Sequence, residues 1–183
     1  VRSRLLFSGL KELETHGVSD FSLRRVAQDA GVSCAAPYRH FKSKNDLIQE
    51  VITAVADRWR ARVTSLLEGH NGCTRQKILD IAIEYIRFLC ENKGYFSVVV
   101  MNEKFLSPKQ IREKSLISEE VRAIIDTYCR EVDMTAEAKT RKTFIVHALI
   151  LGAAEMMTAD SLHYTEENID MVRRCIDREF DIE

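Results

Sequence analysis

Residues that interrupt helices are scarce in this chain, which has seven glycines and two prolines among 183 residues. Apolar residues recur at helical spacing along most of the sequence, and the run from Leu47 to Leu66 extends over about six turns. Only the valine-rich stretch at 95–105 also favours a strand, and a strand without a partner is not stable. We therefore predict an all-α protein.

The stretch 21–41, FSLRRVAQDAGVSCAAPYRHF, predicts two short helices joined by a tight turn. Ser22 can cap the first helix because its side-chain oxygen can accept a hydrogen bond from a backbone N–H of the first turn. Ser33 can cap a second helix over 34–40, which begins with small residues. Pro37 is tolerated there because it falls near the first turn, where a missing N–H costs little. Short helix, glycine turn, short helix is the pattern of a helix-turn-helix motif.

Longer helices are predicted on both sides of this motif. The segment 2–16 precedes it, with Leu6, Leu10 and Leu13 as its apolar stripe. A long helix over 43–67 follows, and Ser43 with Asp46 resembles a capping box at its start. We expect an N-terminal domain over 1–46 and a C-terminal helical domain over 47–183.

The C-terminal part of the sequence predicts a further series of helices. The stretch 69–72, GHNG, is the clearest break in the chain, and capping residues follow it at intervals. These starts lie near Thr74, Ser107, Ser118, Thr135 and Thr165. The helix that begins near Ser118 is predicted to face inward with Val121, Ile124, Ile125, Tyr128 and Val132.

Charge is distributed unevenly along the chain. Residues 1–62 contain eleven Lys/Arg and seven Asp/Glu, whereas the remaining residues contain sixteen and twenty-one. A basic front end on an acidic body is expected of a protein that binds nucleic acid through one end. A difference of this size can also arise by chance, so the charge supports the interpretation without deciding it.

Composition favours a soluble protein without a metal or cofactor. The five cysteines are odd in number and form no CxxC pair, which argues against a zinc site or a disulfide framework and predicts reduced thiols in a cytoplasmic protein. His147, Glu155 and His163 fit no metal-ligand spacing. No apolar run approaches the roughly 18 residues of a membrane span. The first residues are too interrupted for a secretory signal, and because the chain opens on valine, further residues can precede it.

One segment of the chain matches a specific pattern without a gap. It consists of a capping Ser, a Val-Ala pair, an Ala-Gly-Val-Ser turn, a Tyr three residues before a Phe, a Ser-Lys pair and an Asp-Leu pair. The segment resembles the DNA-binding domain of the tetracycline-repressor (TetR) family of bacterial transcriptional regulators. Pro37 departs from the Leu or Ile that this family commonly has. The matching residues are Ser22, Val26-Ala27, Ala30-Gly31-Val32-Ser33, Tyr38, Phe41, Ser43-Lys44 and Asp46-Leu47.

This resemblance implies a homodimer whose three N-terminal helices read DNA and whose C-terminal domain binds a small molecule. It implies that Tyr38, His40 and Lys44 contact phosphates, and that Arg24 and the residues 34–36 reach base edges. Arginine can pair with guanine in the major groove, whereas Cys and Ala side chains are poor donors. The predicted DNA-contacting residues are Ser22, Arg24, Arg25, Ser33, Cys34, Ala35, Ala36, Tyr38, Arg39, His40 and Lys44.

The aromatic and methionine side chains of the C-terminal domain are candidates for the core or for an apolar ligand pocket between helices. His147 is a candidate for the core, an interface or the pocket. Gly152 lies inside an apolar helix, where glycine costs about 1 kcal/mol relative to alanine. Its presence predicts a close helix–helix approach, which we assign to the dimer interface. The predicted pocket residues are Tyr85, Phe88, Phe96, Met101, Phe105, Tyr128, His147 and Met156.

The leading hypothesis is a ligand-responsive DNA-binding regulator, a repressor that a small molecule releases from its operator. Its expected partners are double-stranded DNA, an unidentified small-molecule effector and a second copy of the chain, with no membrane and no cofactor. An all-helical enzyme and a partner-binding module that carries a helix-turn-helix are the alternatives. No phosphate loop, nucleophile–base pair or metal spacing supports an enzyme. The sequence leaves the effector, the operator and the choice between repressor and activator open.

Overall fold

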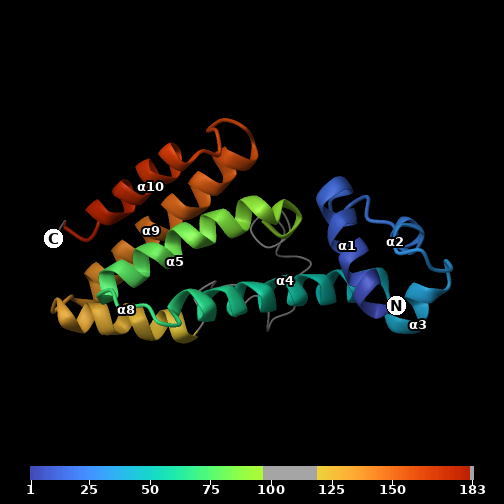
Figure 1. Cartoon of the computed structure of the whole chain (residues 1–183), viewed down its shortest axis with the longest axis horizontal. Helices are drawn as coiled ribbons and strands as arrows, with labels where there is room; N and C mark the ends of the chain where they lie inside the picture. The colour runs from blue at the N-terminus through green and yellow to red at the C-terminus, as the bar shows by residue number, and fades with distance from the viewer. Residues whose placement is uncertain (97–118, 182–183) are drawn as a thin grey trace. The chain divides into compact units, whose positions relative to one another are not determined.

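The structure of the protein is a computed structural model that describes residues 1–96 and 119–181. The predictions for Met101, Phe105 and a helix start at Ser107 lie outside these residues. The described part is helical and contains no strand, which confirms the all-α prediction. Its helices, labelled in Figure 1, are α1 (Arg2–His16), α2 (Leu23–Asp29), α3 (Ala36–His40), α4 (Lys44–Leu67), α5 (Thr74–Glu91), α8 (Glu119–Glu131), α9 (Ala136–Thr158) and α10 (Glu166–Arg178).

Contacts divide the described chain into two compact units. The first contains Val1–Ala61 and residues 92–96, and the second contains Arg62–Glu91 and residues 119–181. Helix α4 is continuous through the point where the first unit ends. The predicted domain boundary between residues 46 and 47 therefore falls inside a helix.

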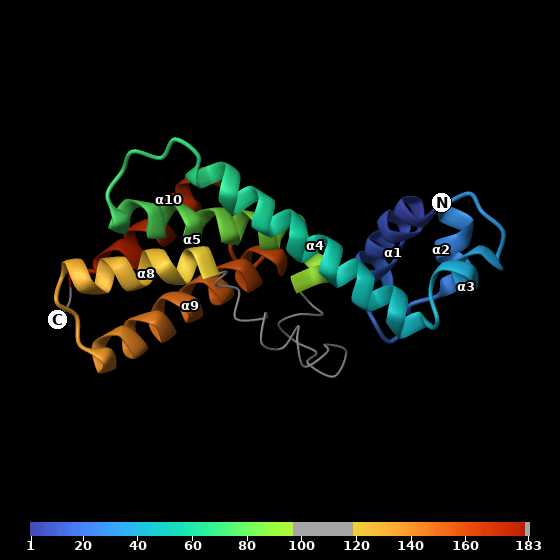
Figure 2. The ribbon, with the colours of Figure 1, turned by 90° about the horizontal axis from the view of Figure 1, so that it is seen from below.

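The first unit is built from α1, α2, α3 and most of α4. Helix α1 contacts α2, and α2 contacts α3 (Figure 2). The buried face of α1 differs from the predicted stripe, because Leu6 and Leu10 are only half-buried while Leu5 is fully buried. Leu13 of the predicted stripe is buried, so the stripe was wrong at Leu6 and Leu10, because leucines occur on both faces of the helix. The core of the unit includes Leu5, Leu13, Val26, Leu47 and Ile48.

Local signals placed the start of α2 and the turn after it correctly. The Ser22 side chain accepts a hydrogen bond from the Arg25 backbone N–H at 3.4 Å, which confirms the predicted cap. Gly31 follows α2 with φ of 63°, a conformation that glycine adopts without strain. The Ser43 side chain likewise accepts from the Asp46 N–H at 3.1 Å, just before α4 begins.

Helix α3 begins at Ala36, two residues later than predicted, and Ser33 does not cap it with its side chain. The reason is Pro37. A helix starting at residue 34 would need residue 37 to donate its backbone N–H to the Ser33 carbonyl, and proline has none. The structure instead places Pro37 in the first turn, where no such bond is required.

In the second unit α5 is the central helix, because it contacts α8, α9 and α10 (Figure 1). Arg75 on α5 pairs with Asp177 on α10 at 2.7 Å. Thr135 and Thr165 cap α9 and α10 through their side chains, as predicted. The buried face of α5 includes Ile78, Ile81, Tyr85, Phe88 and Leu89.

The predicted inward face of α8 is only partly correct. Val121 and Tyr128 are buried, whereas Ile124 and Ile125 are half-buried. Val132 is 47% exposed and was wrongly assigned to this face. Since α8 ends at Glu131, Val132 lies beyond the last helical residue and no longer follows the helical period.

Candidate functional site

Helix α3 presents a polar face to solvent on an apolar base. Pro37 and the following Phe41 are buried. Tyr38, Arg39 and His40 lie between them in the sequence and are exposed, and Tyr38 is exposed by 66% despite its large aromatic ring. Exposure of a tyrosine beside an arginine and a histidine suits a surface that binds phosphates.

The turn before α3 forms the other part of this exposed edge. Ser33, Cys34 and Ala35 are exposed, and Ala36 is half-exposed. None of their side chains is larger than that of a cysteine, so a partner can approach the backbone closely. The serine hydroxyl is the strong donor among them, because a thiol donates weakly and the alanine side chains cannot donate.

The two arginines of α2 have different surroundings. Arg24 is exposed and makes no hydrogen bond or ion pair with any described residue. Arg25 is engaged, because its Nε donates to Glu12 Oε1 at 2.8 Å and its guanidinium lies 3.2 Å from the Asp20 carboxylate. The hydrogen bond to Glu12 is the main cause of a raised pKa of Arg25.

Lys44, the first residue of α4, is half-buried beside the loop between α1 and α2. Its ammonium lies 3.5 Å from the Ser19 carbonyl oxygen and 6.0 Å from the centre of the Phe21 ring. The latter contact is a cation–π interaction at the limit of its range. These two contacts hold the positive charge of Lys44 near the start of the helix-turn-helix.

The structure therefore places the predicted DNA-contacting residues in one unit, on α2, the turn, α3 and the start of α4. Ser22 is half-buried and serves as the α2 cap. Sequence reasoning missed Glu12, a buried acid on α1 that binds Arg25. The sequence signal for Glu12 is its position next to Leu13 and one helical turn after Ser8 and Gly9. All four residues lie on the face of α1 that the structure buries.

The predicted ligand-pocket residues of the described chain belong to both units and differ in exposure. Tyr85, Phe88 and Tyr128 are buried in the second unit, whereas Phe96 is buried in the first. The tyrosine and phenylalanine rings of α5 lie 6.4 Å apart, centre to centre. Two other predicted pocket residues, His147 and Met156, are exposed.

Two grooves flank the turn between α8 and α9 in the second unit. One has a volume of about 480 Å³ and is lined by Tyr128, Met134, Lys142 and Phe180 among others. The other has a volume of about 630 Å³ and lies along Asp126, Cys129 and Lys139. Both volumes fall in the range of small-molecule sites, although neither groove encloses a ligand on all sides.

The described residues hold no group of three or more His, Cys, Asp or Glu side chains arranged to bind a metal ion. None of the helices in the described part of the chain is both long and apolar enough to cross a membrane.

The fold and the exposed edge of α2 and α3 define an all-α helix-turn-helix protein, and comparison with known proteins narrows this class. Residues 5–51 match the family model described as bacterial regulatory proteins, tetR family. An HTH-type transcriptional regulator of Staphylococcus aureus (strain USA300) is 24% identical over 99 residues, which are 54% of this chain and 52% of that protein. The chain thus spans about half the length of the curated relatives it matches.

Solved structures of transcriptional regulators share the fold over nearly the whole chain. A TetR family transcription regulator from Marinobacter aquaeolei VT8 matches with a TM-score of 0.75 and 17% identity, over 97% of this chain and 94% of that one. The transcriptional regulator FadR from Bacillus subtilis, solved in complex with stearoyl-CoA, matches with a TM-score of 0.69 and 12% identity, over 95% and 96%. Residues 5–51 thus match the TetR family of bacterial regulators, in agreement with the resemblance found in residues 22–47.

Proposed function

We propose that this cytoplasmic protein is a transcriptional repressor that binds double-stranded DNA as a homodimer and leaves it when a small molecule binds. Residues 1–46 would form the DNA-binding domain, and residues 47–183 the effector-binding and dimerisation domain. The observation that carries the proposal is the exposed edge of α2, the turn and α3 within a TetR-family domain. In a dimer, two copies of this edge would enter successive major grooves about 34–36 Å apart.

The proposed contacts follow from exposure and chemistry. Tyr38, His40 and Lys44 would hold phosphate oxygens and fix the register on the duplex. Arg24 and Arg39 are exposed and make no hydrogen bond or ion pair with other described residues, so they are free to reach base edges. The small side chains of residues 34–36 would contact the methyl groups of thymine.

The direct test is selection of duplexes from a random-sequence DNA library by the full chain. We expect an enriched duplex that carries two related half-sites, because the proposed dimer is symmetric. A library from which the chain enriches no sequence would contradict the proposal. It would also favour the alternative of a partner-binding module.

The phosphate contacts predict a distinctive dependence on salt. Lys44→Ala should weaken binding to the enriched duplex and make the slope of log K against log salt shallower by about one per protomer. Tyr38→Ala should weaken binding without this change of slope, because the tyrosine carries no charge. Titrations between 50 and 200 mM salt measure both, with Lys77→Ala on α5 as the control. Unchanged binding in both variants would refute the contact assignments.

An exposed apolar stripe on α9 supports the proposed dimer. Phe144, Ala148, Gly152 and Met156 recur every four residues, so they lie along one face of the helix. All four are exposed, Phe144 by 73% and Met156 by 46%. Apolar surface of this kind marks an interaction site. Since α9 also contacts α10, we propose that both helices pair with their counterparts in a four-helix bundle.

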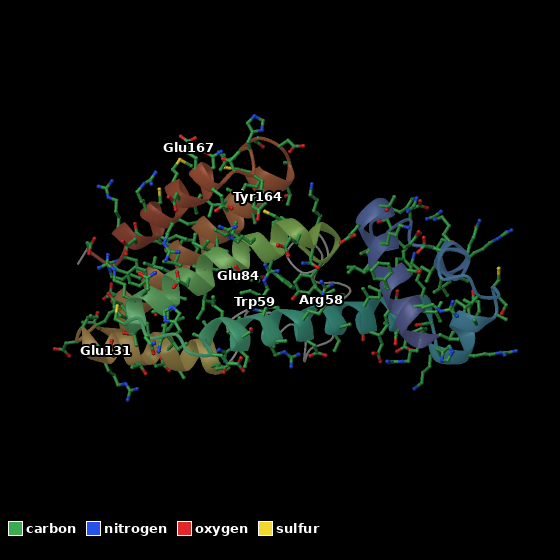
Figure 3. All side chains as sticks on the ribbon, in the orientation of Figure 1. Arg58, Trp59, Glu84, Glu131, Tyr164 and Glu167 are labelled. Carbon is green, nitrogen blue, oxygen red and sulfur yellow. The ribbon has the colours of Figure 1, made fainter. Side chains whose placement is uncertain are left out.

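Long-chain acyl-CoA is the first class of effector to test. The support is the stearoyl-CoA bound to FadR, which shares this fold. Trp59 is the only tryptophan, is 4% exposed and lies on α4 (Figure 3). We expect stearoyl-CoA to change the Trp59 emission and release the enriched duplex at the same concentration, while coenzyme A alone does neither. Release by no member of an acyl-chain series would exclude this class.

A further inference from the structure

Glu12 is an acidic residue on the buried face of α1, where its buried neighbours include Leu5, Gly9 and Leu13. Its side chain is only 6% exposed. A buried carboxylate is costly unless hydrogen bonds replace the water that it loses. The hydrogen-bond partners of the Glu12 carboxylate therefore show which parts of the protein it holds together.

Both oxygens of Glu12 have partners in the first unit. Oε1 accepts hydrogen bonds from the Ser22 backbone N–H at 2.9 Å and from Arg25 Nε at 2.8 Å. Oε2 lies 3.2 Å from His16 Nδ1. The Arg25 guanidinium also donates to the backbone carbonyl of Asp20. Glu12 therefore fixes the start of α2 to α1 at two positions, the Ser22 cap and Arg25.

We propose that Glu12 is a positioning residue for DNA recognition, and that Arg25 clamps α2 to α1 and does not contact DNA. Arg24, the next residue in the chain, is exposed and makes no hydrogen bond or ion pair with any described residue. It is the α2 arginine that reaches a base edge, in a direction that the clamp sets. This inference rests on the proposed DNA-binding function and changes the role predicted for Arg25.

The clamp is better suited to fixing a direction than to adding stability. A buried ion pair contributes little net stability compared with apolar residues of similar size. The interface between α1 and α2 already has Leu5, Leu13 and Val26 as buried apolar residues. The planar guanidinium of Arg25, in contrast, directs both Nε and Nη2 at Glu12 Oε1, at 2.8 and 2.6 Å, and this fixes the direction of the side chain. The bonds that Glu12 accepts from the Ser22 N–H and from Arg25 restrict the rotation of α2 on α1.

Two variants of the full chain test the inference, Glu12→Gln and Arg25→Gln. Each is measured with the duplex enriched from random-sequence DNA and with a scrambled duplex of the same length and composition. We expect each variant to lower the preference for the enriched duplex about tenfold or more, since a base contact is misplaced. The salt slope should keep its wild-type value. The double variant should be no worse than either single one, because both remove the same clamp.

A direct DNA contact by Arg25 predicts the opposite results. Arg25→Gln would then make the salt slope shallower by about 0.9 per protomer, because one phosphate contact is lost. Glu12→Gln would tighten binding, because it frees a positive charge. Either result overturns the inference. A wild-type chain that enriches no duplex overturns the proposed function as well, which keeps the two failures distinct.

Asp29→Asn is the matched control, because Asp29 forms an exposed ion pair between α2 and Lys11 of α1 at 2.7 Å. Its loss should change the preference by less than about twofold, as surface ion pairs contribute little. Circular dichroism checks that each variant is folded. Should Arg25→Gln fail to fold, Arg25→Lys keeps the charge without the planar guanidinium. It should lose the preference with an unchanged salt slope, and a retained preference overturns the inference.

Discussion

Gly152→Arg is expected to leave the subunit folded while it abolishes the dimer and lowers operator affinity by about a hundredfold or more. Gly152 is exposed on α9, and a Cβ atom placed there meets no atom within 4 Å. A single subunit therefore has room for the arginine side chain. Replacing glycine also stabilises the helix by about 0.5–1 kcal/mol, because arginine has the higher helix propensity. In the proposed dimer that space is filled by a helix of the second copy. Sedimentation and titration of the enriched duplex measure the two effects.

The control for this variant is Ala123→Arg, which adds the same side chain at an exposed small residue of α8. It should remain a dimer with wild-type affinity. A dimeric Gly152→Arg variant would show that the stripe on α9 is not the interface. A monomer that binds the full operator as tightly as the wild type would show that dimerisation is not needed for recognition.

Gly94→Ala is expected to lower the free energy of unfolding of the first unit by about 1–3 kcal/mol, as overpacking does. Gly94 is buried in a short helical segment that follows α5. A Cβ atom there would lie 2.8 Å from the backbone nitrogen of Glu14 and 3.0 Å from its Cα. Backbone atoms of α1 cannot rotate away, so the helix or the segment must shift. Denaturant titration followed by the emission of Trp59, which lies in the same unit, measures the loss.

Combining Gly94→Ala with Glu14→Ala separates two explanations. Glu14 Cγ is also 2.8 Å from the added Cβ, and shortening the side chain removes that contact alone. We expect no recovery of stability, because the backbone contacts persist. Full recovery would mean that the glycine only makes room for a side chain, and that the segment does not need its close approach to α1.

Features set by neighbouring residues could be predicted from the sequence. The caps at Ser22, Thr135 and Thr165 and the turn at Gly31 each depend on a few consecutive residues, and the structure has them as expected. The start of α3 was missed although its cause is also local. Ser33 favours a start at residue 34, but the missing backbone donor of Pro37 outweighs that signal.

Features set by residues far apart in the sequence could not be predicted in the same way. Arg25, one partner of Glu12, lies thirteen residues away on another helix, and only the packing of α1 on α2 reveals the contact. Apolar side chains present a related difficulty, because core, pocket and interface use the same residue types. Met156 was predicted to line a pocket, but it is 46% exposed and lies on the stripe that we assign to the dimer.

The small side chains of residues 33–36 have a consequence for the lifetime of the complex on DNA. Residues 33–36 have few hydrogen-bond donors and add few base-specific bonds to those proposed for Arg24 and Arg39. Differences in affinity between related complexes arise mainly from the dissociation rate. We therefore expect short residence on each operator and frequent rebinding. The fraction of operators that carry the protein would then adjust to the effector-bound fraction of free protein within a few rounds of dissociation and rebinding. A gene under its control would therefore respond soon after the effector concentration changes.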